Sequence, residues 1–146
     1  MVGVGNPILS DDGVGIHIAR ALKELEIRGV DVEELPASGL ELLDMVLDYD
    51  RVIIVDAIVT GRGVPGELHM MEEGDFENTV HGASPHGINI ATALALGRQL
   101  AGERMPSDIR FFAIEAADLV NVSEKLTPAV DAAMPSIIER ILAELE

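Results

Sequence analysis

The sequence predicts an α/β protein, a three-layer sandwich in which a mostly parallel, twisted sheet of about five strands is flanked by helices on both faces. Three observations lead to this prediction. Segments with helical spacing alternate with short apolar runs typical of strands. Hydrophobic residues make up 48% of the chain but aromatic residues only 3%, so the core is aliphatic. The length of 146 residues fits a single domain, residues 1–146, with one core.

The first segment is built around a glycine-rich turn. Residues 1–4 are expected to form a short strand. Residues 13–27 are expected to form an amphipathic helix, because apolar side chains recur there at helical spacing. Gly29 is the residue expected to end that helix. The turn between strand and helix carries two adjacent carboxylates, Asp11 and Asp12.

Two shorter units follow. Residues 30–35 alternate imperfectly and predict a strand, which Pro36 and a turn at 37–39 should end, and residues 40–47 predict a short helix. The run from Arg51 to Asp56 is apolar on both faces, which is typical of a central parallel strand. Asp56 is therefore expected at the carboxyl end of that strand.

The second half of the chain continues the alternation. It is expected to contain, in order, a loop at 57–66, a strand at 67–70, an irregular stretch at 73–87, a helix from Ile88 to about Leu100, a strand at 109–114, a loop to Leu126, and a last helix that Thr127 caps and Pro128 begins. The irregular stretch is the longest, and long loops in compact domains often carry function.

Charge and composition exclude several classes of protein. The chain has 26 acidic and 10 basic residues, a formal net charge of -16, which would repel nucleic acids and anionic membranes. The absence of cysteine excludes disulfides, thiolate metal sites and a cysteine nucleophile. The chain starts without the pattern of a signal peptide and has no apolar run near the ~20 residues of a membrane helix. A cytoplasmic location is therefore expected.

Three candidate site residues follow from strand order. Ligands of such sheets bind beyond the carboxyl ends of the strands, where Asp56 and one of the two carboxylates at 11 and 12 are expected to lie. Of the four histidines, His86 is preferred because it stands beside Pro85 at a helix start. His81 is the second choice, whereas His17 and His69 are expected to be surface residues. Two carboxylates and one imidazole can hold nickel, zinc or iron.

The two adjacent carboxylates are not expected to play the same part. A carboxylate just before a helix stabilises its free amides by ~0.3 to 1 kcal/mol, so one of the two is expected to cap the helix that follows. The residues alone leave open which one does so.

Other interpretations of the same residues are weaker. The dinucleotide pattern G-x-G-x-x-G fails at Ile8, Pro7 removes a backbone donor, and the acidic pair would repel a pyrophosphate, so a nucleotide-binding module is only an alternative. No His-Glu-x-x-His or Gly-x-Ser-x-Gly motif is present, and Ser38 and Ser84 have no evident base beside them. An aspartic-protease dyad of Asp12 and Asp56 is conceivable, but nothing in the sequence places their carboxyls within the distance at which they could share a proton.

Taken together, several motifs resemble those of the hydrogenase maturation endopeptidases. They are Gly3-Val4-Gly5-Asn6, Asp11-Asp12-Gly13-Val14-Gly15, Gly39-Leu40-Glu41-Leu42-Leu43, Val55-Asp56-Ala57, Ser84-Pro85-His86 and Leu126-Thr127-Pro128. The resemblance covers nearly the whole chain. It implies a cytoplasmic endopeptidase that removes a C-terminal peptide from the precursor of a nickel-iron hydrogenase large subunit after nickel insertion.

The resemblance also implies residue roles. Nickel, supplied by the substrate, is expected to be bound by Asp12, Asp56 and His86, and zinc or cadmium could replace it in crystals. It assigns the metal to Asp12 and leaves Asp11 to cap the helix. Substrate contacts are expected at Gly5, Asn6 and Gly39.

Further expectations concern the free protein, its reaction and the alternative to it. The free protein is expected to be a monomer. A water molecule polarised by the metal, or activated by a nearby carboxylate, would attack the peptide bond. The first strand of the family is longer, so this chain looks clipped at its start. A non-catalytic nickel carrier or checkpoint protein is the main alternative function.

Overall fold

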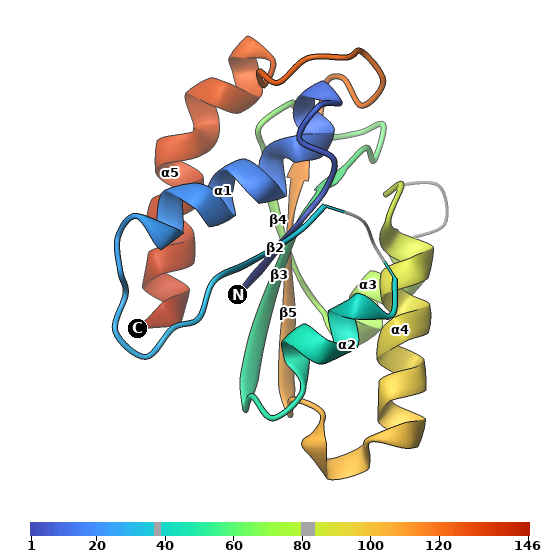
Figure 1. Ribbon diagram of the computed structural model, residues 1–146. Coiled ribbons are helices and arrows are strands. Elements are labelled where there is room, and N and C mark those ends of the chain that lie inside the picture. Colours follow the sequence, from blue (N-terminus) through green and yellow to red (C-terminus); the bar gives the residue numbers. More distant parts are fainter. Residues whose placement is uncertain (37–38, 80–83) are drawn as a thin grey trace.

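The computed structural model describes residues 1–36, 39–79 and 84–146 (Figure 1). Its centre is a five-stranded sheet with strand order β2-β1-β3-β5-β4. The strands are β1 (Val2–Val4), β2 (Glu33–Leu35), β3 (Arg51–Ile58), β4 (Leu68–Glu72) and β5 (Asp108–Glu115). All neighbouring strands pair in parallel except β4, which pairs antiparallel with β5. The predicted mostly parallel α/β fold is confirmed.

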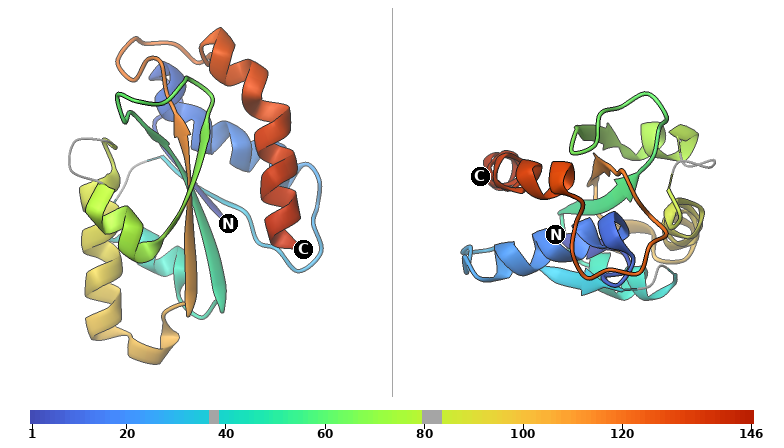
Figure 2. Two further views of the ribbon diagram at one scale, coloured as in Figure 1. Left: turned by 180° about the vertical axis from the view of Figure 1, so that it is seen from behind. Right: turned by 90° about the horizontal axis from the view of Figure 1, so that it is seen from above.

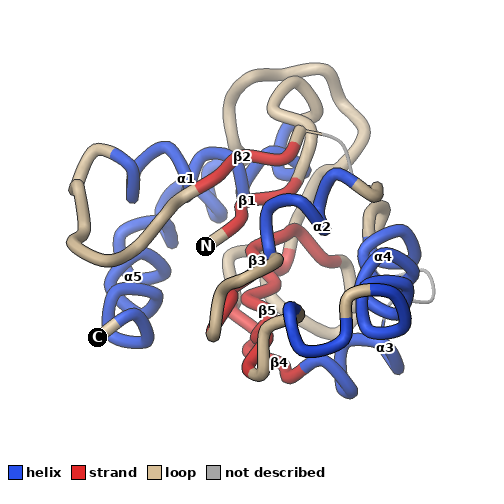
Figure 3. The backbone as a smooth tube through the Cα atoms, turned by 60° about the horizontal axis from the view of Figure 1, so that its bottom comes forward, coloured by secondary structure: helices blue, strands red, loops and turns tan. Residues whose placement is uncertain are grey.

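Helices cover both faces of the sheet. They are the 3-10 helices η1 (Ser10–Gly13) and η2 (Gly102–Arg104), and the α-helices α1 (Val14–Lys23), α2 (Glu41–Val46), α3 (Glu73–Thr79), α4 (Gly87–Leu100) and α5 (Pro128–Leu145). Figure 3 shows α1 and α5 on one side of the strands and α2, α3 and α4 on the other. Among the described helices, none combines the length and apolar character needed to cross a membrane.

The central strand β3 divides the core into two clusters. Its side chains alternate between the faces of the sheet, so Val52 and Ile54 join the cluster beneath α2 and α4, while Ile53 and Val55 join the cluster beneath α1 and α5. Both faces are apolar, which is why the run in the sequence is continuous rather than alternating. The strand also continues two residues beyond Asp56, to Ile58, so Asp56 lies near its carboxyl end and not at it.

The first helix is shorter than expected. It ends at Lys23 rather than near residue 27, because the chain turns at Glu26, whose φ is 46°, and again at Gly29, whose φ is 79°. Gly29 therefore belongs to the turn that follows and does not end the helix. The strand expected at 30–35 is likewise reduced to β2, Glu33–Leu35.

The expected irregular stretch at 73–87 contains a helix. Residues Glu73–Thr79 form α3, a mostly polar segment in which Phe76 is buried. This ring is 2% exposed and stacks on Phe111 of β5 with ring centroids 3.8 Å apart. A helix this short is unstable on its own, and this buried aromatic contact supplies the tertiary packing that stabilises it. His81 and the residues 37–38 of the expected turn lie outside the described residues.

Candidate active site

The position of Asp12 is determined by glycines at two places where backbone segments approach closely. Gly15 of α1 faces β1 and β3, and a Cβ atom there would collide with the carbonyl oxygens of Val4 and Val55. Gly5 adopts a φ of 147°, and a Cβ there would collide with the backbone of Asp12. The Asp12 carboxylate, 2% exposed, accepts a hydrogen bond from the backbone N–H of Asn6 at 3.0 Å. The glycines of the turn thus hold a buried carboxylate at the carboxyl end of β1.

Asp56 provides a second buried carboxylate, on the neighbouring strand β3. It is 3% exposed. Its Oδ1 accepts a hydrogen bond from the backbone N–H of Ala57 at 2.8 Å, and its Oδ2 accepts one from the Ser84 hydroxyl at 2.6 Å. Burial raises the pKa of Asp56 to about 6, while the nearby charge of His86 and the two hydrogen bonds oppose that rise.

His86 is the third residue of the site, and it lies at the start of α4, on the side of the sheet opposite to α1 (Figure 3). It precedes α4, and its Nε2 lies 3.0 Å from Oδ2 and 3.1 Å from Oδ1 of Asp12. The side chain is 14% exposed. The hydrogen bond to Asp12 raises the pKa of His86, and the charge of Asp56 adds to the effect, although partial burial opposes it. The pair therefore favours an imidazolium beside a carboxylate.

Ser84 connects the two halves of the site. Its hydroxyl donates to Asp56 and also accepts the backbone N–H of His86 at 3.3 Å. The structure thus brings together all three residues predicted from the sequence. No local sequence pattern indicates this role for Ser84, because its acceptor Asp56 lies 28 positions away along the chain.

The donor atoms fit part of a metal site. Two ligands about 2.1 Å from an ion, on adjacent octahedral vertices, are about 3.0 Å apart, and the Asp12 oxygens lie 3.0 and 3.1 Å from His86 Nε2. One imidazole and carboxylate oxygens suit divalent transition metals. In the described part of the chain, however, no three His, Asp or Glu side chains converge into a ready cage for an ion. Asp12 and His86 instead bind one another, and Asp56 binds Ser84.

The expected helix cap at Asp11 is wrong. Neither η1 nor α1 has a side-chain cap hydrogen bond. The Asp11 carboxylate points the other way and accepts four hydrogen bonds: from the backbone N–H groups of Ala117 at 2.9 Å, Asp118 at 3.1 Å and Thr127 at 2.8 Å, and from the Thr127 hydroxyl at 2.8 Å. Asp11 therefore fixes the segment between β5 and α5, because that distant segment offers it more donors than the helix start does.

A further buried carboxylate, Glu115, organises the loop after β3. It is 2% exposed and accepts hydrogen bonds from the backbone N–H groups of Thr60 and Gly63, each at 2.9 Å, and from the Thr60 hydroxyl. The sequence analysis missed it, although an acidic residue after an apolar strand is the same signal that pointed to Asp56. His69 Nε2 lies 4.0 Å from Oε1 of this carboxylate, and the His69 side chain is 28% exposed, so it is only partly the surface residue that was expected.

The remaining candidates are placed less tightly. Asn6 is half-buried beside Asp12, and Gly5 lies in the same turn. Gly39 precedes α2, beside the Glu41 side chain. His17 is half-buried on α1 rather than at the surface, and its Nε2 is buried.

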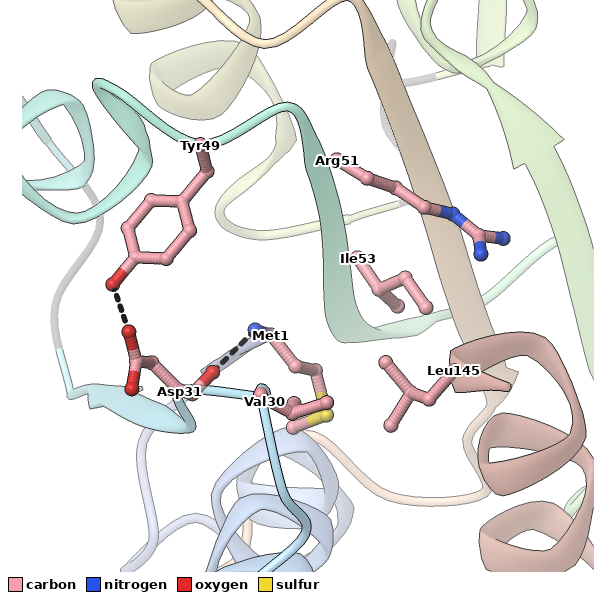
Figure 4. Close-up of a pocket in the computed structure, with 8 residues that line it drawn as sticks. Met1, Val30, Asp31, Tyr49, Arg51, Ile53 and Leu145 are labelled. Atoms are coloured by element: carbon pink, nitrogen blue, oxygen red, sulfur yellow. Dashed lines mark hydrogen bonds between the residues drawn. The ribbon is translucent and has the colours of Figure 1, made fainter.

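A separate pocket lies at the opposite edge of the sheet, by the start of β3 (Figure 4). It has a volume of about 180 Å³, and its lining includes Met1, Asp31, Tyr49, Arg51 and Leu145. The N-terminal ammonium donates to the carbonyl oxygen of Asp31 at 2.7 Å, and its partial burial lowers its pKa. This pocket contains none of the predicted site residues.

Comparison with known proteins identifies the family. The model of a family described as hydrogenase maturation protease matches residues 16–144. Hydrogenase 2 maturation protease of Escherichia coli strain K12 is 32% identical over 151 residues, which covers 99% of this chain and 88% of the relative.

Solved structures agree. The hydrogenase maturating endopeptidase HybD from E. coli superimposes with a TM-score of 0.79 at 29% identity, covering 99% of this chain and 89% of that one. The NiFe hydrogenase maturation protease HybD from Thermococcus kodakarensis gives 0.80 at 25% identity, with coverage of 99% and 95%. The resemblance inferred from the motifs is confirmed: this chain belongs to the hydrogenase maturation protease family, whose members are endopeptidases.

Proposed function

We propose that this protein removes the C-terminal extension from the precursor of a nickel-iron hydrogenase large subunit, and that nickel already carried by the precursor is the recognition element. The observation that carries the proposal is the contact of His86 with Asp12, beside the buried Asp56, at the carboxyl edge of the sheet. The names of the relatives support a hydrogenase as the partner.

The arrangement of the free site suits an ion that arrives with the substrate. Asp12 and His86 form a partly buried ion pair, so a free ion must first separate the two side chains before it can bind them. The imidazole must also lose a proton before it can bind a metal, and the contact with Asp12 opposes that loss. An ion already held by the precursor brings the binding energy of a protein interface with it, which offsets these costs.

The reaction is a peptide-bond hydrolysis. A water molecule polarised at the site attacks the carbonyl carbon of the scissile amide, the C–N bond breaks, the new terminus of the subunit is a carboxylate, and the released peptide takes a proton on its amine. Asp12, Asp56 and His86 hold the nickel of the substrate and so place the peptide bond beside it.

The direct test compares nickel-loaded with nickel-free precursor. Each is incubated with the purified protein, and mass spectrometry measures whether the precursor is shortened. We expect shortening of the loaded form only, loss of shortening with His86→Gln, and normal shortening with the control His69→Gln, which lies outside the site.

Each other outcome has a distinct meaning. If the loaded precursor binds without being shortened, the protein is a nickel checkpoint or carrier and the endopeptidase assignment fails. If the nickel-free form is cut equally well, nickel recognition fails while the peptidase activity stands.

A further inference from the structure

The segment between β5 and α5 is fixed firmly against the start of the chain. Besides the four hydrogen bonds to Asp11, the backbone of Ser123 accepts from Ser10 N–H at 2.9 Å and donates to the Ile8 carbonyl oxygen at 2.9 Å. Leu9 and Ser123 form an isolated parallel β-bridge. In the view from above in Figure 2, this orange segment passes around the blue η1 and the start of α1. The loop is therefore a rigid part of the structure.

A turn within this segment is fixed as well. The Asp118 carboxylate accepts hydrogen bonds from the backbone N–H groups of Val120 at 2.9 Å and Asn121 at 3.1 Å, and from the Asn121 side chain at 2.6 Å. Leu119 packs against the core beneath α1 and α5. The conformation of the turn is thus determined from both ends.

This rigid turn displays apolar side chains to solvent. Val120 is 79% exposed and Val122 is 81% exposed. Ile8, whose carbonyl oxygen accepts the hydrogen bond from Ser123 N–H, is 49% exposed. Single exposed apolar residues are common on protein surfaces. Exposed tight turns, however, usually carry polar residues. Ile8 and Val120 stand on hydrogen-bonded backbone. Val122 lies between the hydrogen-bonded Asn121 and Ser123. These β-branched side chains therefore have little conformational freedom left to lose on contact with a partner.

We propose that Ile8, Val120 and Val122, together called the apolar platform, dock the folded large-subunit precursor. This inference rests on the proposed function, since it names the surface by which the substrate of that site is held. The platform is continuous with the site along the chain: Asp11 fixes the segment that carries the valines, and the next residue, Asp12, contacts His86.

Two observations favour a folded protein as the occupant. Ile88, two positions after His86, is 58% exposed, so one further apolar side chain is exposed close to a residue of the site. The net charge of -16 disfavours anionic membranes and nucleic acids as partners. The partner surface is expected to be apolar and uncharged beside its processed terminus, because apolar side chains gain most from such contact.

The test uses the double variant Val120→Ser/Val122→Ser and, as matched control, Leu100→Ser, which replaces a 76% exposed residue at the far end of α4. Cleavage kinetics and precursor binding are both measured with nickel-loaded precursor. Losing a buried valine contact weakens binding about 10-fold, so we expect KM and Kd of the double variant to rise on the order of 100-fold. We expect kcat and the thermal midpoint to stay unchanged, and the control to behave as wild type.

The readouts separate failure of the platform from failure of the proposed function. Unchanged KM and Kd in the double variant would overturn the platform while the endopeptidase stands. Loss of binding in the double variant, with a wild type that binds but does not cut, would support the platform and overturn the peptidase. If the double substitution alters only self-association in sedimentation experiments, the platform contacts a second copy of the chain and the proposal is wrong.

Discussion

Replacing Asp56 by Asn should make the protein more stable and inactive. The carboxylate is buried, and its pKa is raised from 3.8 to about 6. At about 1.4 kcal/mol per pKa unit, keeping it ionised costs the folded state roughly 3 kcal/mol above pH 7. Asn removes the charge but must rearrange the hydrogen bond with Ser84, so the expected net gain is about 1 to 3 kcal/mol. For a chain of this size, that raises Tm by roughly 3 to 10 °C.

The sign of the pH dependence follows from the raised pKa. A carboxyl whose folded pKa lies above its unfolded value adds no cost below pH 3.8, and the cost grows until the pH passes about 6. The stability gain of Asp56→Asn should therefore be about 1 kcal/mol larger at pH 8 than at pH 5.

Urea unfolding at the two pH values measures this gain, and mass spectrometry of the precursor measures activity. Asp44→Asn, at an exposed position of α2, serves as the control and should change stability by less than ~0.5 kcal/mol. A variant that is less stable than wild type at pH 8, or one that still shortens the precursor, would refute the reasoning.

Three further substitutions test how the site is supported. Asp11→Asn leaves backbone N–H groups facing an amide and should destabilise the protein by about 2 to 4 kcal/mol in urea unfolding; a loss below ~1 kcal/mol would contradict its role in fixing the loop. Gly15→Ala places a methyl group against the carbonyls of β1 and β3 and should cost more than ~2 kcal/mol, whereas Gly74→Ala, which meets open space in α3, should be neutral or stabilising by up to ~1 kcal/mol. Ser84→Ala removes the link between Asp56 and the His86 backbone and should slow cleavage, while Ser84→Thr, which keeps the hydroxyl, should restore it; equal rates for the two variants would show that the hydroxyl is not needed.

The sequence alone predicted the layer architecture and pointed to Asp56, His86 and one of the two carboxylates at 11 and 12, and the family resemblance then selected Asp12. Alternating apolar periods required a parallel sheet between helices, and the carboxyl ends of parallel strands meet at one edge. Asp56, near the end of β3, and Asp12, in η1 after β1, are therefore both expected at that edge. The preference for His86 followed from its place at a helix start in the loop that reaches that edge.

Only the tertiary structure decided which groups satisfy one another. Asp11 bonds donors 106 to 116 positions away, and Ser84 bonds Asp56 across 28 positions, so neither contact has a signature in the local sequence. Helix α3 is stabilised by the stacking of Phe76 on Phe111. The Asp11 carboxylate does not cap the helix that follows it, because it accepts four hydrogen bonds from a distant loop instead. Local propensities are worth a few tenths of a kcal/mol to ~1 kcal/mol per residue, and these long-range contacts outweigh them.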